Sequence, residues 1–187
     1  EGRALDVAVA HNGLTRSNVF GLIRALGSET AGALRFSDAD AGQDATADRV
    51  DPTLREIPLA ELDERIAQRD ALPFSVWDGR VRMSVAGLQD KLLVYLDAPP
   101  EQGGRLWLVD GQRLASTHIL KPDTGHPRTP HLAVNEHFCM RLARRLGLPA
   151  AEVALLRTPR PVLLVERFDR VREVPERIRR LHMVDVC

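Results

Sequence analysis

The chain has 187 residues, which corresponds to one domain of about 150 residues, or one domain plus a piece, and suffices for a sizeable core. Basic and acidic residues balance at 26 each, which argues against a polyanion binder held by bulk charge but leaves a local basic patch open. The hydrophobic share of 44% is typical of a globular protein, and no apolar stretch approaches the roughly 18 residues of a membrane span. The two cysteines form no CxxC pair, so we expect a reduced, cytoplasmic protein without a membrane segment.

The two ends of the sequence are unusual for a complete protein. The chain lacks an initiator Met, and its last residues form an apolar-periodic stretch without a cap or a polar tail. We therefore expect a fragment of a longer protein.

The first part of the chain is predicted to be mainly helical. Leu5, Val9 and Ala10 share one face of an opening helix, and Ser17 is the expected N-cap of a second helix that Gly27 closes. The remaining elements expected here are a strand (Ala31–Phe36), a loop (Ser37–Asp51) and a helix after Pro58 (Leu59–Arg69).

A cluster of strands follows, interrupted by one helix. Alternating or apolar runs predict strands at Val81–Val85, Leu92–Leu96, Arg105–Val109, Thr117–Lys121, Val153–Leu156 and Val162–Glu166. The segment Asp97–Gly104 has the prolines and glycines of a hairpin connection. The helix His131–Leu146 carries basic residues in its last turns and ends at Gly147.

Lysine is rare in this sequence. Lys91 and Lys121 are the only two lysines among the 26 basic residues, and the other 24 are arginines. A compact ammonium serves as a point charge on a phosphate, where a planar guanidinium has a different geometry. Lys91 closes a short turn that contains Gly87, and Lys121 ends a predicted strand.

This pattern has two interpretations. A turn between strands presents backbone N–H groups to an anion, and a lysine on a neighbouring strand reaches the same anion, as in a kinase N-lobe. Glu136 then lies early in the following helix, where a glutamate would orient Lys121. Alternatively, both lysines are ordinary exposed residues, since one glycine is a far weaker signal than G-x-G-x-x-G.

Five motifs, in order and with compatible spacing, resemble the HipA-type serine/threonine kinase toxins. They are a phosphate-loop motif (Ser84-Val85-Ala86-Gly87-Leu88-Gln89-Asp90-Lys91), a lysine strand (Thr117-His118-Ile119-Leu120-Lys121-Pro122), a helix (Asn135-Glu136-His137-Phe138-Cys139-Met140), a hinge (Val165-Glu166-Arg167-Phe168-Asp169-Arg170) and the start of a further helix (Arg180-Leu181-His182 with Asp185 and Cys187). The match covers roughly residues 20–187 and is weakest over residues 37–80.

The resemblance implies a role for each matched position. The loop Ala86, Gly87, Leu88, Gln89, Asp90 and Lys91 would wrap the ATP phosphates, and Lys121 would pair with them. Glu166 and Phe168 would offer backbone groups to adenine at the hinge, and Ser84 would be autophosphorylated. Glu136 as the partner of Lys121 is an inference from kinase geometry.

The implied architecture is an α+β kinase-like N-lobe, an antiparallel sheet with packed helices, without the C-lobe. Residues 1–70 would belong to the N-terminal region of such a toxin, residues 71–170 to the N-lobe, and residues 171–187 to the start of the C-lobe. The catalytic residues and the Mg²⁺ ligands would lie beyond this chain, so the fragment alone should be inactive. The resemblance further implies a HipB-like antitoxin, contact with DNA only through that antitoxin, and a protein substrate such as an aminoacyl-tRNA synthetase.

Other features of the sequence have alternative interpretations. A non-catalytic module that docks an antitoxin or another protein is the alternative to a kinase. His126, His131, His137 and Cys139 fit no common zinc spacing, so no metal site is expected. Arg141, Arg144 and Arg145 are interpreted as a solvated helix face, Cys139 as a packed thiol, and Asp123 as a turn former rather than a base.

Overall fold

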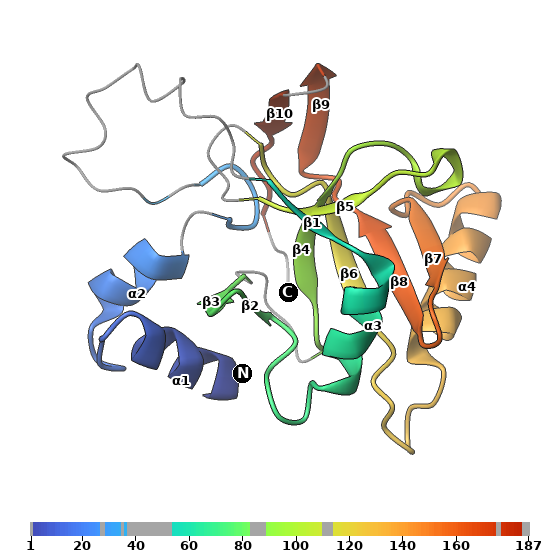
Figure 1. Ribbon diagram of the computed structural model, residues 1–187. Coiled ribbons are helices and arrows are strands. Elements are labelled where there is room, and N and C mark those ends of the chain that lie inside the picture. The colour runs from blue at the N-terminus through green and yellow to red at the C-terminus, as the bar shows by residue number, and fades with distance from the viewer. Residues whose placement is uncertain are drawn as a thin grey trace.

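The computed structural model describes residues 2–26, 29–34, 36, 54–82, 89–109, 114–174 and 177–184 (Figure 1). The α-helices in these ranges are α1 (Gly2–His11), α2 (Val19–Leu26), α3 (Leu59–Ala67) and α4 (Leu132–Arg145), and a short 3₁₀ helix, η3, covers Pro100–Gln102. The strands are β1 (Arg55–Ile57), β2 (Val76–Trp77), β3 (Arg80–Val81), β4 (Leu92–Leu96), β5 (Leu106–Leu108), β6 (His118–Pro122), β7 (Val153–Arg157), β8 (Pro161–Glu166), β9 (Arg170–Val174) and β10 (Arg177–Arg180).

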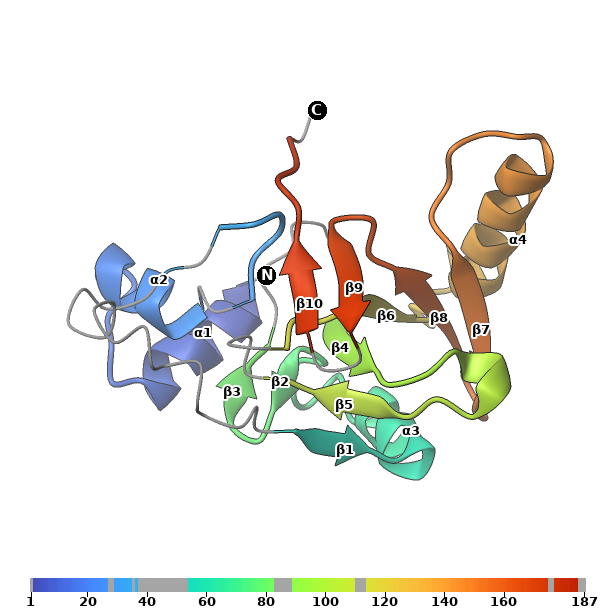
Figure 2. The same cartoon turned by 90° about the horizontal axis from the view of Figure 1, so that it is seen from above.

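Six strands form one antiparallel sheet in the order β1-β5-β4-β6-β8-β7. Two short hairpins, β2–β3 and β9–β10, stand beside it. Figure 2 shows α3 on one side of the sheet, and α4 with the β9–β10 hairpin on the other. The protein is therefore an α+β fold in which β4 and β6 are the central strands.

The alternation of side chains along β4 and β6 fills both faces of the sheet. On one face, Val94 and Leu120 join a core with Leu62 and Ile66 of α3 and with Trp77. On the other face, two smaller clusters lie under the covering elements. Tyr95 packs near Ile178 of β10, and the cluster under α4 comprises Ala133, Val153, Leu163 and Val165, with Ile119, Met140 and Ala151 at its border.

Most predicted elements are confirmed, within one or two residues. The strand Leu92–Leu96 has the predicted bounds, and α3, α4 and the other predicted strands of the main sheet lie close to theirs. The N-cap of α2 is Asn18 rather than Ser17, because the Asn18 side-chain oxygen accepts the Gly21 N–H at 2.9 Å. Residues 37–51 and 83–88 lie outside the described residues, so the predicted loop and most of the strand Val81–Val85 do too.

Three further expectations are wrong. Cys139 on α4 is exposed, so it is not the packed thiol expected from its apolar neighbours. The segment 31–34 is a turn rather than a strand, because Gly32 has a φ of +68° and the backbone turns there. The helix expected from Arg180 does not begin there, since Arg180 ends β10 and residues 181–184 have no regular structure. The β9–β10 hairpin occupies this region instead, and Ile178 anchors it to the sheet.

Strands β1, β2, β9 and β10 were not predicted. The β2–β3 hairpin carries a signal that sequence reasoning missed, the Asp78-Gly79 pair, in which both residues have positive φ, 51° and 73°. β1 pairs with β5, and α3 contributes Leu62 and Ile66 to the core, so residues 55–67 belong to the sheet and its cover.

Candidate functional site

Lys121 lies on the central strand β6, on the face that α4 covers. Its neighbour two residues earlier, Ile119, packs at the border of the cluster under α4, whereas Leu120 between them points into the core on the α3 face. The backbone alternation therefore directs Lys121 toward α4. It pairs in register with Leu163 of β8.

Glu136 on α4 meets Lys121. The Lys121 Nζ donates to Glu136 Oε1 at 2.5 Å, and the two side chains are 22% and 25% exposed. A half-buried pair of this kind is held more firmly than a surface ion pair, because solvent screens it less. The predicted partnership of Lys121 and Glu136 is thus present as a direct contact.

Asp123 fixes the segment between β6 and α4. Its Oδ1 accepts the Gly125 N–H at 3.2 Å, which closes a turn, and its Oδ2 accepts the Ala133 N–H in the first turn of α4 at 3.4 Å. Ala133 is completely buried against the sheet, which seats the helix. Asp123 therefore forms the turn and holds the start of α4, as its sequence context predicted.

The described part of the predicted phosphate loop lies next to β6. Ser84, Ala86, Gly87 and Leu88 lie outside the described residues. Gln89 Nε2 donates to the Pro122 carbonyl, one residue beyond Lys121, at 3.5 Å. Asp90 is exposed, but Lys91 is only 5% exposed. With Lys91 buried and Lys121 paired, the view of both lysines as ordinary exposed residues is wrong.

The hinge begins in the last residues of β8, which ends at Glu166, and continues directly after that strand. The Glu166 N–H donates to the Glu152 carbonyl at 2.9 Å, and the Arg167 N–H donates to the Thr117 carbonyl at 2.9 Å. Phe168 is 71% exposed, although the residues on both sides of it, Arg167 and Asp169, are buried. Glu166 pairs in register with His118, three residues before Lys121 on β6.

A buried charged cluster explains why Phe168 faces outward. We call Glu29, Ser116, Arg167, Asp169 and Arg170 the hinge cluster; all five are at most 9% exposed. Arg167 donates two hydrogen bonds to Asp169, from Nε to Oδ1 at 2.9 Å and from Nη2 to Oδ2 at 2.7 Å. Because these two side chains turn inward together, the residue between them must point to the solvent.

The hinge cluster joins segments that are remote in the sequence. Ser116 Oγ donates to Glu29 Oε2 at 2.6 Å and accepts from Arg167 Nη1 at 2.9 Å. Arg170 Nη1 donates to Asp169 Oδ2 at 2.9 Å, and Arg180 Nη2 donates to Glu29 Oε1 at 3.0 Å. Each carboxylate is therefore shared between guanidinium groups, which is what a buried charge requires.

Burial and pairing shift the protonation of this cluster. Burial works against the charged form of Asp169, but hydrogen bonds and charge from Arg167, with help from Gly32 and Arg170, outweigh it and hold the pKa of Asp169 below its usual range. Burial, then the neighbouring Arg167 charge, lowers the pKa of Arg170 to about 10. Both groups stay charged at neutral pH.

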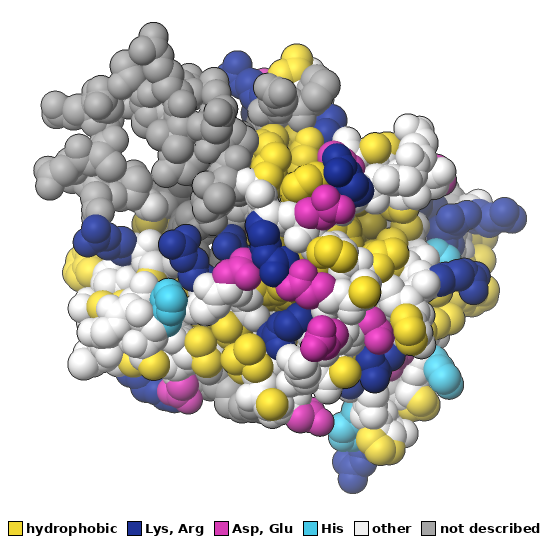
Figure 3. Space-filling model, viewed as in Figure 1, with side chains coloured by type: hydrophobic (Ala, Val, Ile, Leu, Met, Phe, Trp, Pro, Cys, Tyr) yellow, Lys and Arg dark blue, Asp and Glu magenta, His cyan; other side chains and the backbone are white. Residues whose placement is uncertain are grey.

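Charges of both signs lie side by side on the face around α3, β1 and β5, among the residues that the structure describes. Figure 3 shows basic and acidic side chains interspersed there. The pairs include Arg55 with Glu61, Arg105 with Glu56 and Arg160 with Asp63. This mixed charge is consistent with the zero net charge of the chain.

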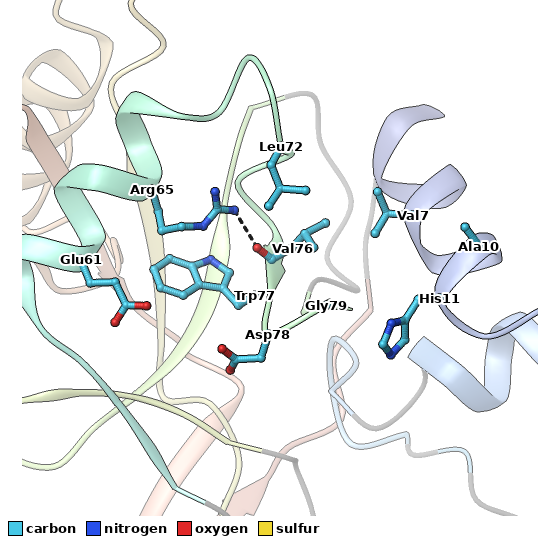
Figure 4. Close-up of a pocket in the computed structure, with 10 residues that line it drawn as sticks. All are labelled: Val7, Ala10, His11, Glu61, Arg65, Leu72, Val76, Trp77, Asp78 and Gly79. Atoms are coloured by element: carbon cyan, nitrogen blue, oxygen red, sulfur yellow. Dashed lines mark hydrogen bonds between the residues drawn. The ribbon is translucent and has the colours of Figure 1, made fainter.

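A cavity of about 460 Å³ lies away from the lysine pair, between α1, α3 and the β2–β3 hairpin (Figure 4). Trp77 forms part of its wall, with the Arg65 guanidinium 5.4 Å from the ring centre and bonded to the Val76 carbonyl at 2.7 Å. Of the predicted site residues that the structure describes, none lines this cavity. It lies on the α3 side of the sheet, opposite Lys121 and Glu136.

Comparisons with known proteins indicate the family of the chain. The family profile of the HipA-like C-terminal domain matches residues 83–187, more than half of the chain. A serine/threonine-protein kinase toxin HipA of Shewanella oneidensis is 38% identical over the whole chain, and a putative kinase, Y4mE, of Sinorhizobium fredii is 38% identical over 94% of it. The chain spans 40% of the length of each of these relatives.

A solved structure leads to the same family. The complex of Shewanella oneidensis HipA with HipB and its operator DNA contains a chain that is 35% identical, with a TM-score of 0.66 over 96% of this chain and 39% of that one. The curled antiparallel sheet with its covering helices is a kinase-like N-lobe. The chain belongs to the HipA-like family of toxin kinases.

No helix in the described ranges is both long enough and apolar enough to span a bilayer.

Proposed function

We propose that this chain supplies the nucleotide-binding lobe of a serine/threonine protein kinase of the HipA type. The observation that carries the proposal is the 2.5 Å contact between Lys121 on β6 and Glu136 on α4. Protein kinases use such a pair to hold a lysine against the nucleotide phosphates. A compact ammonium suits that task, and this chain otherwise uses arginine for nearly all its positive charges.

The hinge is the proposed binding site for the adenine base of ATP. The Glu166 carbonyl and the Phe168 N–H are the groups that would bind the edge of adenine. The Glu166 N–H is already engaged by Glu152, so the carbonyl is the group that Glu166 contributes. Three residues of β6 separate the register position of Glu166 from Lys121, about 10 Å along the strand, a distance over which one nucleotide would extend from base to phosphates.

The proposed phosphate loop is residues 86–91. Gln89 of this loop donates a hydrogen bond to the carbonyl of Pro122, the residue that follows Lys121. The residues that hold Mg²⁺ and orient the substrate hydroxyl are expected outside this chain. Bound Mg²⁺ would neutralise charge on the phosphates of ATP. The chain by itself is therefore proposed to transfer no phosphate and to bind nucleotide weakly.

The proposal extends to regulation and partners. Autophosphorylation of Ser84 would add about −1.5 to −2 charges beside the phosphate loop and would lower ATP affinity by repulsion. The match to a HipA–HipB–DNA complex supports a HipB-like antitoxin as partner. We propose that DNA is contacted only through that antitoxin. A cytoplasmic protein such as an aminoacyl-tRNA synthetase is the proposed type of substrate.

The test uses the full-length protein that contains this chain, purified without its antitoxin. Incubation with ATP labelled at the γ-phosphate and with Mg²⁺ should label serine or threonine residues of a protein acceptor. Mass spectrometry of the same sample should find phosphate on Ser84. Absence of any transfer by the full-length protein, across cytoplasmic extracts as acceptor, contradicts the kinase assignment.

A further inference from the structure

We propose that the hinge cluster is a positioning device that sets the preference of this site for adenine over guanine, an inference that rests on the proposed function. Base recognition at the hinge would depend on one carbonyl, that of Glu166, and one N–H, that of Phe168. Adenine presents a donor and an acceptor to such a pair, whereas guanine presents the opposite order. A fixed pair therefore accepts one base and leaves polar groups unpaired with the other.

The hinge cluster fixes the backbone on both sides of Phe168. Arg167 and Asp169 are 4% and 3% exposed and are joined by two hydrogen bonds across Phe168. The Leu181 N–H holds the Asp169 carbonyl at 2.9 Å. The carbonyl and N–H groups that flank Phe168 therefore have little freedom to rotate.

A second segment, residues 29–32, anchors the cluster from the N-terminal part of the chain. The Thr30 carbonyl accepts from Arg167 Nη2 at 3.0 Å and from Arg170 Nη2 at 2.8 Å. The Gly32 N–H donates to Asp169 Oδ2 at 2.7 Å. This segment is thus needed to complete the hinge, although it is remote from Lys121 in the sequence.

Ser116 links the cluster to the strand that carries Lys121. Its hydroxyl lies between Glu29 and Arg167, two residues before β6 begins. The cluster consequently holds the hinge in register with the central strand. We infer that loosening the hinge cluster weakens the selection of adenine over guanine and leaves the Lys121–Glu136 pair intact.

The experiment measures ATP and GTP turnover by the full-length protein and by two variants, Ser116→Ala and Arg167→Lys. Ser116→Ala removes only the bridging hydroxyl, while a lysine at 167 cannot reach Asp169, Ser116 and Thr30 together. Arg172→Lys is the matched control, because Arg172 on β9 contacts Tyr95 Oη on β4 at 2.8 Å and does not belong to the cluster. Thermal unfolding shows which variants are folded.

The expected result is a ratio of kcat/KM for ATP over GTP that falls at least about tenfold in Arg167→Lys and several-fold in Ser116→Ala. The change should lie in KM for ATP, with kcat at saturation within about twofold of wild type. The reason is that the contacts to the adenine base are equally strong in the ground state and in the transition state. Arg172→Lys should keep the wild-type ratio. A merely structural role would lower stability without changing the ratio.

The outcomes separate the two proposals. If the wild type uses ATP and the folded variants keep its ATP-to-GTP ratio, the positioning role is wrong and the kinase assignment stands. The same holds if the wild type uses ATP and GTP equally. If the wild type uses neither nucleotide, the proposed function fails and this inference fails with it. Ser116→Ala keeps the test decisive should Arg167→Lys not fold.

Discussion

Glu136 Oε1 lies 2.5 Å from Lys121 Nζ and thereby ties helix α4 to the central strand of the sheet. A pair of matching length exists on the opposite face of the sheet, where Arg55 Nη2 meets Glu61 Oε1 at 2.5 Å. The two pairs have comparable exposure, at 22% and 25% against 35% and 32%. Breaking the Arg55–Glu61 pair therefore serves as a control: it shows what the loss of an ion pair does by itself, without an effect on nucleotide use.

Substitution of Glu136 by Gln should lower kcat/KM for ATP of the full-length protein by about tenfold or more, equivalent to about 1.4 kcal/mol. The reason is that the lysine loses the carboxylate that orients it toward the phosphates. Steady-state kinetics with ATP provides the measurement. Glu61→Gln, which breaks the comparison pair, should leave kcat/KM within about twofold, and an equal loss in both variants would contradict a special role for Glu136.

The connection between β4 and β5 contains two adjacent glycines with different constraints. A Cβ on Gly104 would lie 1.8 Å from the Ala98 carbonyl oxygen, a backbone atom that cannot move aside cheaply. Gly103 has a φ of +77° but open space around its Cα. Gly103→Ala should therefore cost about 1 kcal/mol from backbone strain, while Gly104→Ala should cost about 2–3 kcal/mol or more.

Urea unfolding of the two glycine variants measures this difference. Gly104→Ala should unfold at a clearly lower urea midpoint than Gly103→Ala. Equal midpoints would mean that the connection relaxes freely and does not fix the β4–β5 register.

His118 at the start of β6 gives the protein an acid-sensitive group. Burial, and next the charge of Arg172, lower the pKa of His118 to about 4. Because the folded-state pKa lies below the unfolded value of 6.5, the contribution to stability is complete above pH 6.5 and is lost as the pH falls toward 4. The loss should reach up to about 3 kcal/mol.

The free energy of unfolding between pH 7 and pH 4.5 tests this assignment. Wild type should lose stability progressively in this window, and His118→Gln should have a shallower slope there. The pKa of Asp169 is also lowered in the fold, so its contribution is lost at still lower pH. Identical slopes in wild type and His118→Gln would show that another group is responsible.

Local patterns were sufficient to predict the elements that carry Lys121 and Glu136, whereas their pairing was inferred from kinase geometry. The apolar run Leu92–Leu96, the branched strand that ends at Lys121 and the amphipathic helix that carries Glu136 all have strong periodic signals. Glu136 is also close to Lys121 in the sequence, 15 residues away.

The hinge cluster could not be predicted, because its partners are far apart in the sequence. Arg167 and the Thr30 carbonyl that it binds are 137 residues apart. The available signal was the charged run from Glu166 to Arg170 directly after a buried strand, which indicates paired charges but not their partners. Strand β9 (Arg170–Val174) was not predicted either, because its charged residues mask the strand pattern.

The most direct test of the account is nucleotide titration and phosphate transfer by the full-length protein with Lys121 replaced by Met and, separately, by Arg. The account predicts that both variants keep the wild-type melting behaviour while activity falls by orders of magnitude, since a guanidinium does not replace the compact contact of the ammonium. A folded Lys121→Arg variant with near-normal ATP turnover would contradict it.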